Sequence, residues 1–290
     1  MKRRVTHFPI YLLLLCLSAG FFSGISACSI LKPSPSSTTG DGITNRWAVL
    51  FEKDGYDDVG MTNLPVDYIS MNLIEALLLE SGWELARIHS IPEFSQKDFV
   101  EELNWLEDQT DADDLIFVYV AAHGRYLSHI IQWEEVFPPE WENIRAEKIL
   151  LVDACEAGKF IKTVEQIPGN QIVIGAVQEY EYGWCGLEDE GLPIIGFVYT
   201  HYFSQAFTDS GSDADKDGFI SVQEAALWAE EQQRDYMHEV VFEVPEFAED
   251  YRELGIDPEN SPDFPHTVLS DTIGEPVILS LDVSAATSSP

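Results

Sequence analysis

Three continuous apolar stretches constrain the fold of this chain more than any other feature of its sequence. They cover Leu115–Ala121, Ile149–Val152 and Ile172–Ile174. A strand with one wet face alternates apolar and polar residues, whereas a strand buried on both faces is apolar throughout. Helical patterns alternate with these stretches, which is typical of an α/β domain. We therefore expect a parallel central sheet that is covered by helices on both faces.

The region before these stretches contains two further strand candidates and two helix candidates. We expect strands at Trp47–Phe51 and Trp83–Ile88, and a helix over Val66–Leu79 that stops at a Ser-Gly pair. A second helix is predicted over Ser95–Leu106, because Ser95 is followed at the third position by Asp98, in the pattern of a capping box. No repeat of fixed period is visible, and no second break in composition precedes the tail at about Ser284, which favours a single domain.

The amino-terminal segment has the order of a bacterial export signal. Lys2–Arg4 is basic, and the apolar run that follows, Tyr11–Phe22, is too short for a comfortable membrane span. Ile25–Cys28 then resembles a lipobox, in which the chain is cut just before a cysteine that carries lipid. We predict a signal peptide over residues 1–27 and lipidation at Cys28. An ordinary secretory signal with a chance cysteine is the alternative.

Residues 28–45 are rich in Pro, Ser and Thr, so we expect a flexible linker there. Acyl chains on Cys28 would hold the protein on a membrane stably. The predicted location is therefore outside the cytoplasm, anchored by lipid to a bacterial-type cell membrane and facing the periplasm or the exterior. One folded domain is predicted over residues 46–284, and a disordered tail over residues 285–290.

Charge and cysteine content narrow the class of protein. The 290-residue chain has 51 acidic and 16 basic residues, and nucleic acid is excluded as a ligand because binding a polyphosphate needs a basic face. Such acidity fits an exposed protein or one that binds cations. Four cysteines are too few for a disulfide scaffold. Cys16 leaves with the leader and Cys28 carries lipid, so only Cys155 and Cys185 remain as thiols.

Two reactive side chains follow neighbouring strand candidates. One strand leads into His123 and Gly124, and the other leads into Asp153, Ala154 and Cys155. Ligands of an open parallel sheet bind beyond the carboxyl ends of its strands, so His123 and Cys155 would share one edge. A thiol needs a nearby base to act as a nucleophile, and Gly124 lets the backbone approach a substrate oxygen. Each residue alone is more often structural; together they favour a catalytic pair.

The segments Val118–Gly124 and Asp153–Gly158 resemble the two active-site segments of the caspase-like cysteine peptidases, above all the legumain (haemoglobinase) branch and the metacaspases. The resemblance implies a three-layer α/β sandwich with a mostly parallel central sheet. It also implies that Cys155 is the nucleophile and His123 the general base. The backbone N–H groups of Gly124 and Cys155 would form the oxyanion hole. The thiolate would attack a peptide carbonyl, and water or an amine would release the acyl-enzyme.

The same resemblance implies a specificity pocket that contains Asp153, Glu181 and Gly183. An anionic floor at Asp153 would suit Arg or Lys at P1, the residue before the scissile bond, or the amide of Asn. The alternative is an Asp that caps nearby N–H groups at the strand end. Legumain has Ser where this chain has Tyr182 and Gly183, and its Arg-His pair after the first strand is replaced by Glu52–Asp54. These departures put asparaginyl specificity in doubt. Cys185 is either a buried thiol or a redox latch near the nucleophile.

Residues 213–224 match the twelve-residue EF-hand loop at its diagnostic positions, with Gly218 at the sharp turn. Helical patterns over Phe197–Phe207 and Val222–Tyr236 flank the loop. Since a single loop lacks the paired partner of calcium sensors, we expect one structural Ca²⁺ site. Its predicted ligands are Asp213, Asp215, Asp217, Phe219, Ser221 and Glu224.

The favoured function is that of a membrane-anchored cysteine endopeptidase that cleaves peptide or protein substrates after Arg, Lys or Asn. Two alternatives stay open. The first is a catalytically inactive caspase-like surface module that binds calcium. The second is a transpeptidase, which forms the same acyl-enzyme but passes the acyl group to an amine.

Overall fold

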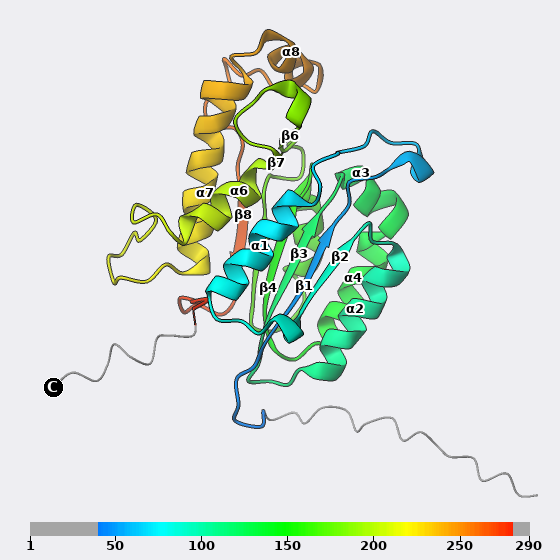
Figure 1. Cartoon of the computed structure of the whole chain (residues 1–290), viewed down its shortest axis with the longest axis vertical. Helices are drawn as coiled ribbons and strands as arrows, with labels where there is room; N and C mark the ends of the chain where they lie inside the picture. Colours follow the sequence, from blue (N-terminus) through cyan, green and yellow to red (C-terminus); the bar gives the residue numbers. More distant parts are fainter. Residues whose placement is uncertain (1–39, 281–290) are drawn as a thin grey trace, which may run out of the picture. The chain divides into compact units, whose positions relative to one another are not determined.

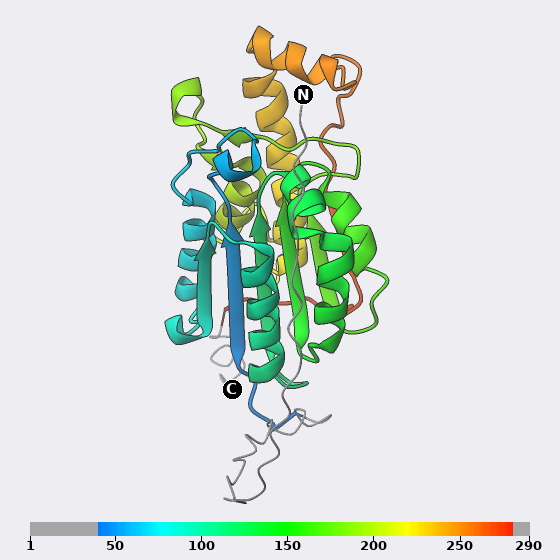
Figure 2. The same cartoon turned by 90° about the vertical axis from the view of Figure 1, so that its right-hand side faces the viewer.

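The computed structural model describes residues 40–280 (Figures 1 and 2). The predicted signal peptide, the predicted lipidation site Cys28 and the predicted tail lie outside the described residues. Between residues 40 and 280, no helix combines the length and the hydrophobicity that a bilayer span requires.

A six-stranded sheet forms the centre of the described region, in the order β2-β1-β3-β4-β5-β8. All neighbouring pairs are parallel except β5 and β8, which are antiparallel. The prediction of an α/β fold with a mostly parallel central sheet is therefore confirmed. The strands are β1 (Arg46–Glu52), β2 (Ile88–Pro92), β3 (Leu115–Ala121), β4 (Glu147–Asp153), β5 (Gln171–Gly175) and β8 (Val268–Asp271).

Helices cover both faces of this sheet (Figures 1 and 2). One face carries α1 (Ile69–Glu80), α6 (Val198–Ala206) and α7 (Val222–Tyr236). The other carries α2 (Gln96–Gln109), α4 (Trp133–Asn143) and α5 (Ala157–Val164). The site is built from shorter elements as well: α3 (Gly124–Tyr126), the hairpin β6 (Cys185–Gly186) and β7 (Gly196–Phe197), and α8 (Pro245–Glu253).

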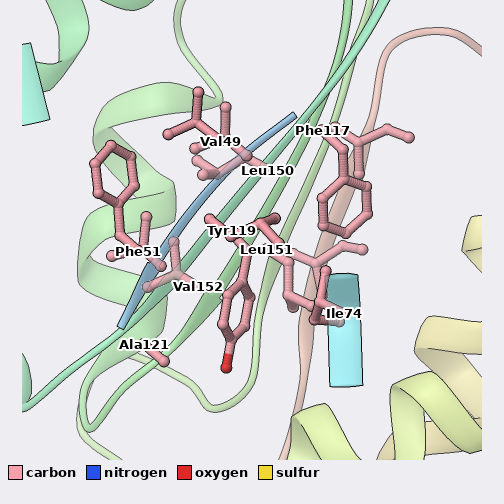
Figure 3. Packing of buried hydrophobic residues seen from close by; sticks show 14 of the residues in the cluster. Val49, Phe51, Ile74, Phe117, Tyr119, Ala121, Leu150, Leu151 and Val152 are labelled. Carbon is pink, nitrogen blue, oxygen red and sulfur yellow. The ribbon is translucent and has the colours of Figure 1, made fainter. Parts of the chain in front are cut away.

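The continuous apolar strands are buried on both faces, as their composition predicts. Phe117 of β3 packs toward α1 and α6, whereas Phe51 of β1 packs on Phe99 of α2, with ring centroids 4.9 Å apart. Figure 3 shows Phe117 on the side of Ile74 in α1, and Val49 and Phe51 on the opposite side. Each strand therefore contributes alternate side chains to two apolar layers, which fixes the strand register.

One predicted strand is misplaced. Trp83–Ile88 contains a short 3-10 turn at Leu85–Arg87, and β2 begins only at Ile88. Trp83 is buried against Phe117, and its indole N–H donates to the carbonyl of Leu279 at 3.0 Å. The tryptophan thus packs into the core ahead of β2, and it is apolar because it is buried, not because it belongs to a strand. The capping box at Ser95 and the helices around residues 213–224 are confirmed.

A second, smaller apolar cluster lies around α8, at the carboxyl-terminal edge of the sheet (Figure 1). It joins the end of α7 and the π-helical turn Met237–Val241 to α8 and to the segment around Phe264. Partly buried Tyr182 and Trp184 pack against it from the loop after β5. This cluster therefore connects the carboxyl-terminal part of the chain to the edge at which β3 and β4 end.

Candidate active site

The ends of β3 and β4 lie side by side. Ala121 pairs with Asp153 in a parallel register, so His123 and Cys155, each two residues further on, emerge at the same edge of the sheet. Both residues line one cavity of about 130 Å³. Asp153, Gly183 and Cys185 line it as well. The structure thus brings five of the residues that the sequence singles out to one place.

Cys155 stands on a sharp turn between β4 and α5. The next residue, Glu156, has a left-handed backbone with φ of 58°, which a residue with a side chain rarely adopts. Such a conformation costs about 1–3 kcal/mol and persists only where the surroundings hold it. Here the Glu156 N–H donates to the Glu181 carbonyl at 2.7 Å, and Gly158 N–H donates to Val177 at 2.8 Å. The turn therefore presents the thiol at the rim of the sheet.

The His123 imidazole is held from the β1–α1 loop. Its Nε2 lies 2.9 Å from the carbonyl oxygen of Thr62, and since a carbonyl only accepts, Nε2 carries the proton. Nδ1 is then the basic nitrogen. The His123 backbone N–H donates to the hydroxyl of Tyr56 at 2.9 Å, and the two rings lie 4.6 Å apart. Thr62 and Tyr56 therefore fix both the tautomer and the position of the predicted base.

Gly124 lies against the backbone of Cys155. A Cβ atom at this position would stand 2.1 Å from the Cys155 carbonyl oxygen, so only glycine fits. As the first residue of α3, Gly124 has an N–H without a partner inside the helix. Neither this N–H nor that of Cys155 donates a backbone hydrogen bond within residues 40–280. Neither amide is therefore committed to a backbone carbonyl of the described residues, and both lie beside the thiol.

The resting thiol is protonated. Burial raises the pKa of Cys155 to about 11, a backbone hydrogen bond from Gly183 acts in the opposite direction, and the negative charges of Asp153 and Glu156 raise it further. A nucleophile in this environment needs a base that takes its proton as the reaction proceeds. His123, the predicted base, lines the same cavity.

Asp153 and Glu52 place two buried carboxyl groups at this edge of the sheet. One oxygen of Asp153 accepts from the backbone N–H and the hydroxyl of Thr200, at 2.9 and 2.7 Å. Burial nevertheless raises the pKa of Asp153 to about 6. Glu52 at the end of β1 is fully buried and accepts from the Met71 N–H. Burial, with the charges of Asp54 and Asp153, raises the pKa of Glu52 to about 8.

The other two predicted pocket residues lie differently. Gly183 lines the cavity, whereas Glu181 does not. The Glu181 carboxylate lies 2.6 Å from Nδ1 of His266, and it accepts from the backbone N–H groups of His266 and Gln178 at 2.8 and 3.1 Å. Glu181 therefore braces the loop after β5 and is turned away from the space that a substrate would fill.

Cys185 shares the cavity wall with Cys155, and both thiols are free among the described residues. Burial raises the pKa of Cys185 well above its usual range, and the negative charge of Asp153 adds to this. The second thiol is therefore also protonated in the resting protein. The redox latch stays a prediction.

The predicted calcium loop lies away from this cavity, between α6 and α7. Carboxylate oxygens of Asp213, Asp215 and Glu224 lie within 4.8 Å of one another. Oδ1 of Asp213 is buried without a hydrogen-bond partner among the described residues, an oxygen that a cation would satisfy. Gly218 has φ of 88°, as the predicted sharp turn requires. These residues fit a Ca²⁺ ion.

Two other predicted ligands have local partners. Oδ1 of Asp217 accepts from the Phe219 N–H at 2.8 Å, and the Ser221 hydroxyl caps α7 by accepting from the Glu224 N–H. The structure places the carbonyl-bearing Phe219 in the same turn. The role of these three residues as ligands stays a prediction.

Several residues around the candidate site carry no signal in the sequence. Thr62 binds His123 through its backbone carbonyl, a group that every residue has. Thr200 binds Asp153 from α6, a helix that is distant in the sequence. Tyr56 follows an acidic loop and would be taken for a surface residue, yet it is fully buried.

Comparison with known proteins defines the fold. No protein-family model matches the chain, and no curated protein matches it. Among solved structures, the chain is similar to a caspase-1 from Spodoptera frugiperda, with a TM-score of 0.53 and 9% sequence identity. The match covers 86% of this chain and 94% of the caspase. The chain therefore has a caspase-like fold, as the two short motifs imply.

Proposed function

We propose that the protein is a cysteine endopeptidase that cleaves after Arg or Lys. The observation that carries the proposal is the shared cavity, which is lined by a thiol, an oriented imidazole and a buried carboxyl group, with two amides beside it that donate to no backbone carbonyl within residues 40–280. The caspase-like fold supports a cysteine peptidase. The strained turn at Glu156 costs stability, which a purely structural role would not require.

The reaction follows from the groups at hand. Nδ1 of His123 takes the proton from Cys155, and the thiolate attacks the scissile carbonyl carbon. The negative charge that forms on the carbonyl oxygen is stabilised by the N–H groups of Gly124 and Cys155. His123 then gives its proton to the leaving amine. Water, deprotonated by His123, attacks the thioester, releases the acid and restores the thiol.

The acidic wall of the cavity favours a cation over an amide at P1. Asp153 is ionised above about pH 6 and lines the cavity. A guanidinium or ammonium group would pair with Asp153 and recover part of the energy lost by its burial. An Asn side chain carries no charge to do so.

The test is a set of peptide substrates with Arg, Lys, Asn or Asp at P1. Asp153→Asn should lower kcat/KM for the Arg and Lys substrates by about 30-fold or more, because loss of one partner of a buried charge pair costs at least about 2 kcal/mol. A matched control is Asp114→Asn, which changes a buried Asp at the opposite end of β3. Equal loss in both variants would contradict the basic P1 pocket.

Cys155→Ala separates the alternatives. Hydrolysis that persists in this variant would rule out the proposed nucleophile. If the wild type reacts with no peptidyl acyloxymethyl ketone, the protein is the inactive surface module. If an added amine such as glycinamide diverts most of the acyl group, the protein is a transpeptidase.

We also propose a structural Ca²⁺ ion at residues 213–224 and a lipid anchor at Cys28. The cluster of Asp213, Asp215 and Glu224 supports the first, and the lipobox-like sequence supports the second. Calorimetric titration that detects no calcium binding would refute the site. Equal palmitate labelling of the wild type and Cys28→Ala would refute the anchor.

A further inference from the structure

Helix α8 reaches the peptide bond that faces the thiol. The hydroxyl of Tyr251, a buried residue of α8, donates to the carbonyl oxygens of Tyr182 and Gly183, at 3.1 and 3.2 Å. Gly183 lies on the cavity wall, and its backbone N–H is the stronger of two backbone donors that act on the Cys155 thiol. One phenol from the carboxyl-terminal part of the chain therefore holds the segment beside the nucleophile.

The geometry of the peptide unit makes this contact directional. The Tyr182 carbonyl and the Gly183 N–H belong to one planar trans peptide, so they point in opposite directions. A donor that fixes the carbonyl therefore aims the N–H. The same donor polarises the peptide, which strengthens the hydrogen bond that its N–H makes on the other side. Tyr251, the peptide and the thiol form a chain of hydrogen bonds.

The neighbours of Tyr251 keep the phenol in place. Its ring lies 5.2 Å from that of Phe242 and 5.5 Å from that of Phe264. Trp184, which lines the cavity, packs on Phe247 of the same helix with centroids 4.7 Å apart. These contacts belong to the smaller apolar cluster, outside the main core. Side chains of α8 therefore hold the cavity wall by contacting both its backbone, at Tyr182 and Gly183, and its side chain Trp184.

We propose that Tyr251 is a positioning residue that aims the Gly183 N–H at the Cys155 sulfur and so favours the thiolate. The inference rests on the proposed function for its role in peptide cleavage. The effect on the thiol itself can be measured without a substrate.

The experiment compares Tyr251→Phe with Tyr199→Phe in the full-length protein. Tyr199 is also fully buried and donates its hydroxyl to a carbonyl, that of Ala226, at 3.1 Å, but it does not line the cavity. Each variant loses one hydroxyl and keeps its ring. The readout is the rate at which iodoacetamide alkylates Cys155 at a fixed pH, followed by mass spectrometry of the peptide that contains it. Melting temperatures and kcat and KM are measured in parallel.

In Tyr251→Phe the alkylation rate of Cys155 should fall about three- to tenfold, which corresponds to a weakened hydrogen bond to the thiolate. In that variant kcat should fall by a similar factor, with KM changed less than about twofold. Tyr199→Phe should lose a similar amount of stability and alkylate at the wild-type rate. An unchanged rate in Tyr251→Phe, or an equal fall in both variants, would overturn the proposal.

The two hypotheses fail separately. A fall in alkylation in a protein that cleaves no peptide would leave the positioning role standing and remove the peptidase. Cleavage after Arg or Lys by the wild type, with an unchanged alkylation rate in Tyr251→Phe, would leave the peptidase standing and remove the positioning role.

Discussion

Replacing Glu52 by Gln should abolish the pH dependence of stability that this residue confers. Glu52 is fully buried at the end of β1, Oε2 accepts from the Met71 N–H, and Oε1 has no hydrogen-bond partner among the described residues. Burial is the largest cause of its raised pKa, about 8 against an ordinary value of 4.5. Gln has nearly the shape of the protonated acid, keeps an acceptor for Met71 and cannot ionise.

The size and sign of the effect follow from linkage. An acid whose pKa is raised in the folded state binds its proton more tightly there, so its stabilising contribution is complete below the unfolded pKa. This contribution is lost as the pH rises through the folded pKa. As the pH rises from about 5.5 to about 8.5, ionisation of Glu52 should lower the free energy of unfolding by about 3 kcal/mol. The estimate uses about 1.4 kcal/mol for each unit of difference between the folded and unfolded pKa. Glu52→Gln lacks this loss.

Urea unfolding of both proteins at the two pH values measures the difference. The variant should gain about 3 kcal/mol relative to the wild type as the pH rises, a shift well above the error of the linear extrapolation for a protein of this size. Other titrating groups cancel, because both proteins contain them. A constant difference between wild type and variant would show that Glu52 is ionised or solvated in the fold, and the reasoning would fail.

Three further predictions concern the candidate site and the calcium loop. Gly124→Ala would place a Cβ 2.1 Å from the Cys155 carbonyl oxygen, and the resulting displacement of about 1 Å should lower kcat/KM about a hundredfold, measured with unchanged far-UV circular dichroism. Calcium at a hundredfold excess over its dissociation constant should stabilise the wild type by about 2.7 kcal/mol and Glu224→Gln much less, as followed by melting temperature. Propylguanidine, a mimic of the Arg side chain, should accelerate the alkylation of Cys155 several-fold, and Asp153→Asn should abolish the acceleration.

The parallel core of the fold could be predicted because its signal is local. Leu115–Ala121 is apolar throughout, and only a strand buried on both faces needs that composition. The strand-end position of His123 and Cys155 follows from the same runs, since a parallel register carries both to one edge. Residues 213–224 encode a loop geometry in twelve consecutive positions, so no tertiary contact is needed to recognise it.

The rest depends on contacts between segments far apart in the sequence. Thr62 orients His123 across 61 positions, and Tyr251 reaches Tyr182 across 69. Neither contact leaves a pattern, because one uses a backbone carbonyl and the other a tyrosine that resembles any core aromatic. Glu181 illustrates the opposite case: it lies in the right segment of sequence, but its bond to His266 turns it from the cavity.

In the free protein, the negative charge on the cavity wall disfavours the thiolate form of Cys155. A basic substrate should therefore gain in reaction rate as well as in binding affinity. After burial, the negative charge of Asp153 is among the causes that raise the pKa of Cys155. A cation at P1 would neutralise that charge and lower the free energy of the thiolate at the moment the substrate is bound. An uncharged P1 residue of similar size could fill the cavity but would leave the thiol in its resting state. Because only interactions that strengthen toward the transition state raise kcat, selectivity for Arg and Lys should appear in kcat as well as in KM.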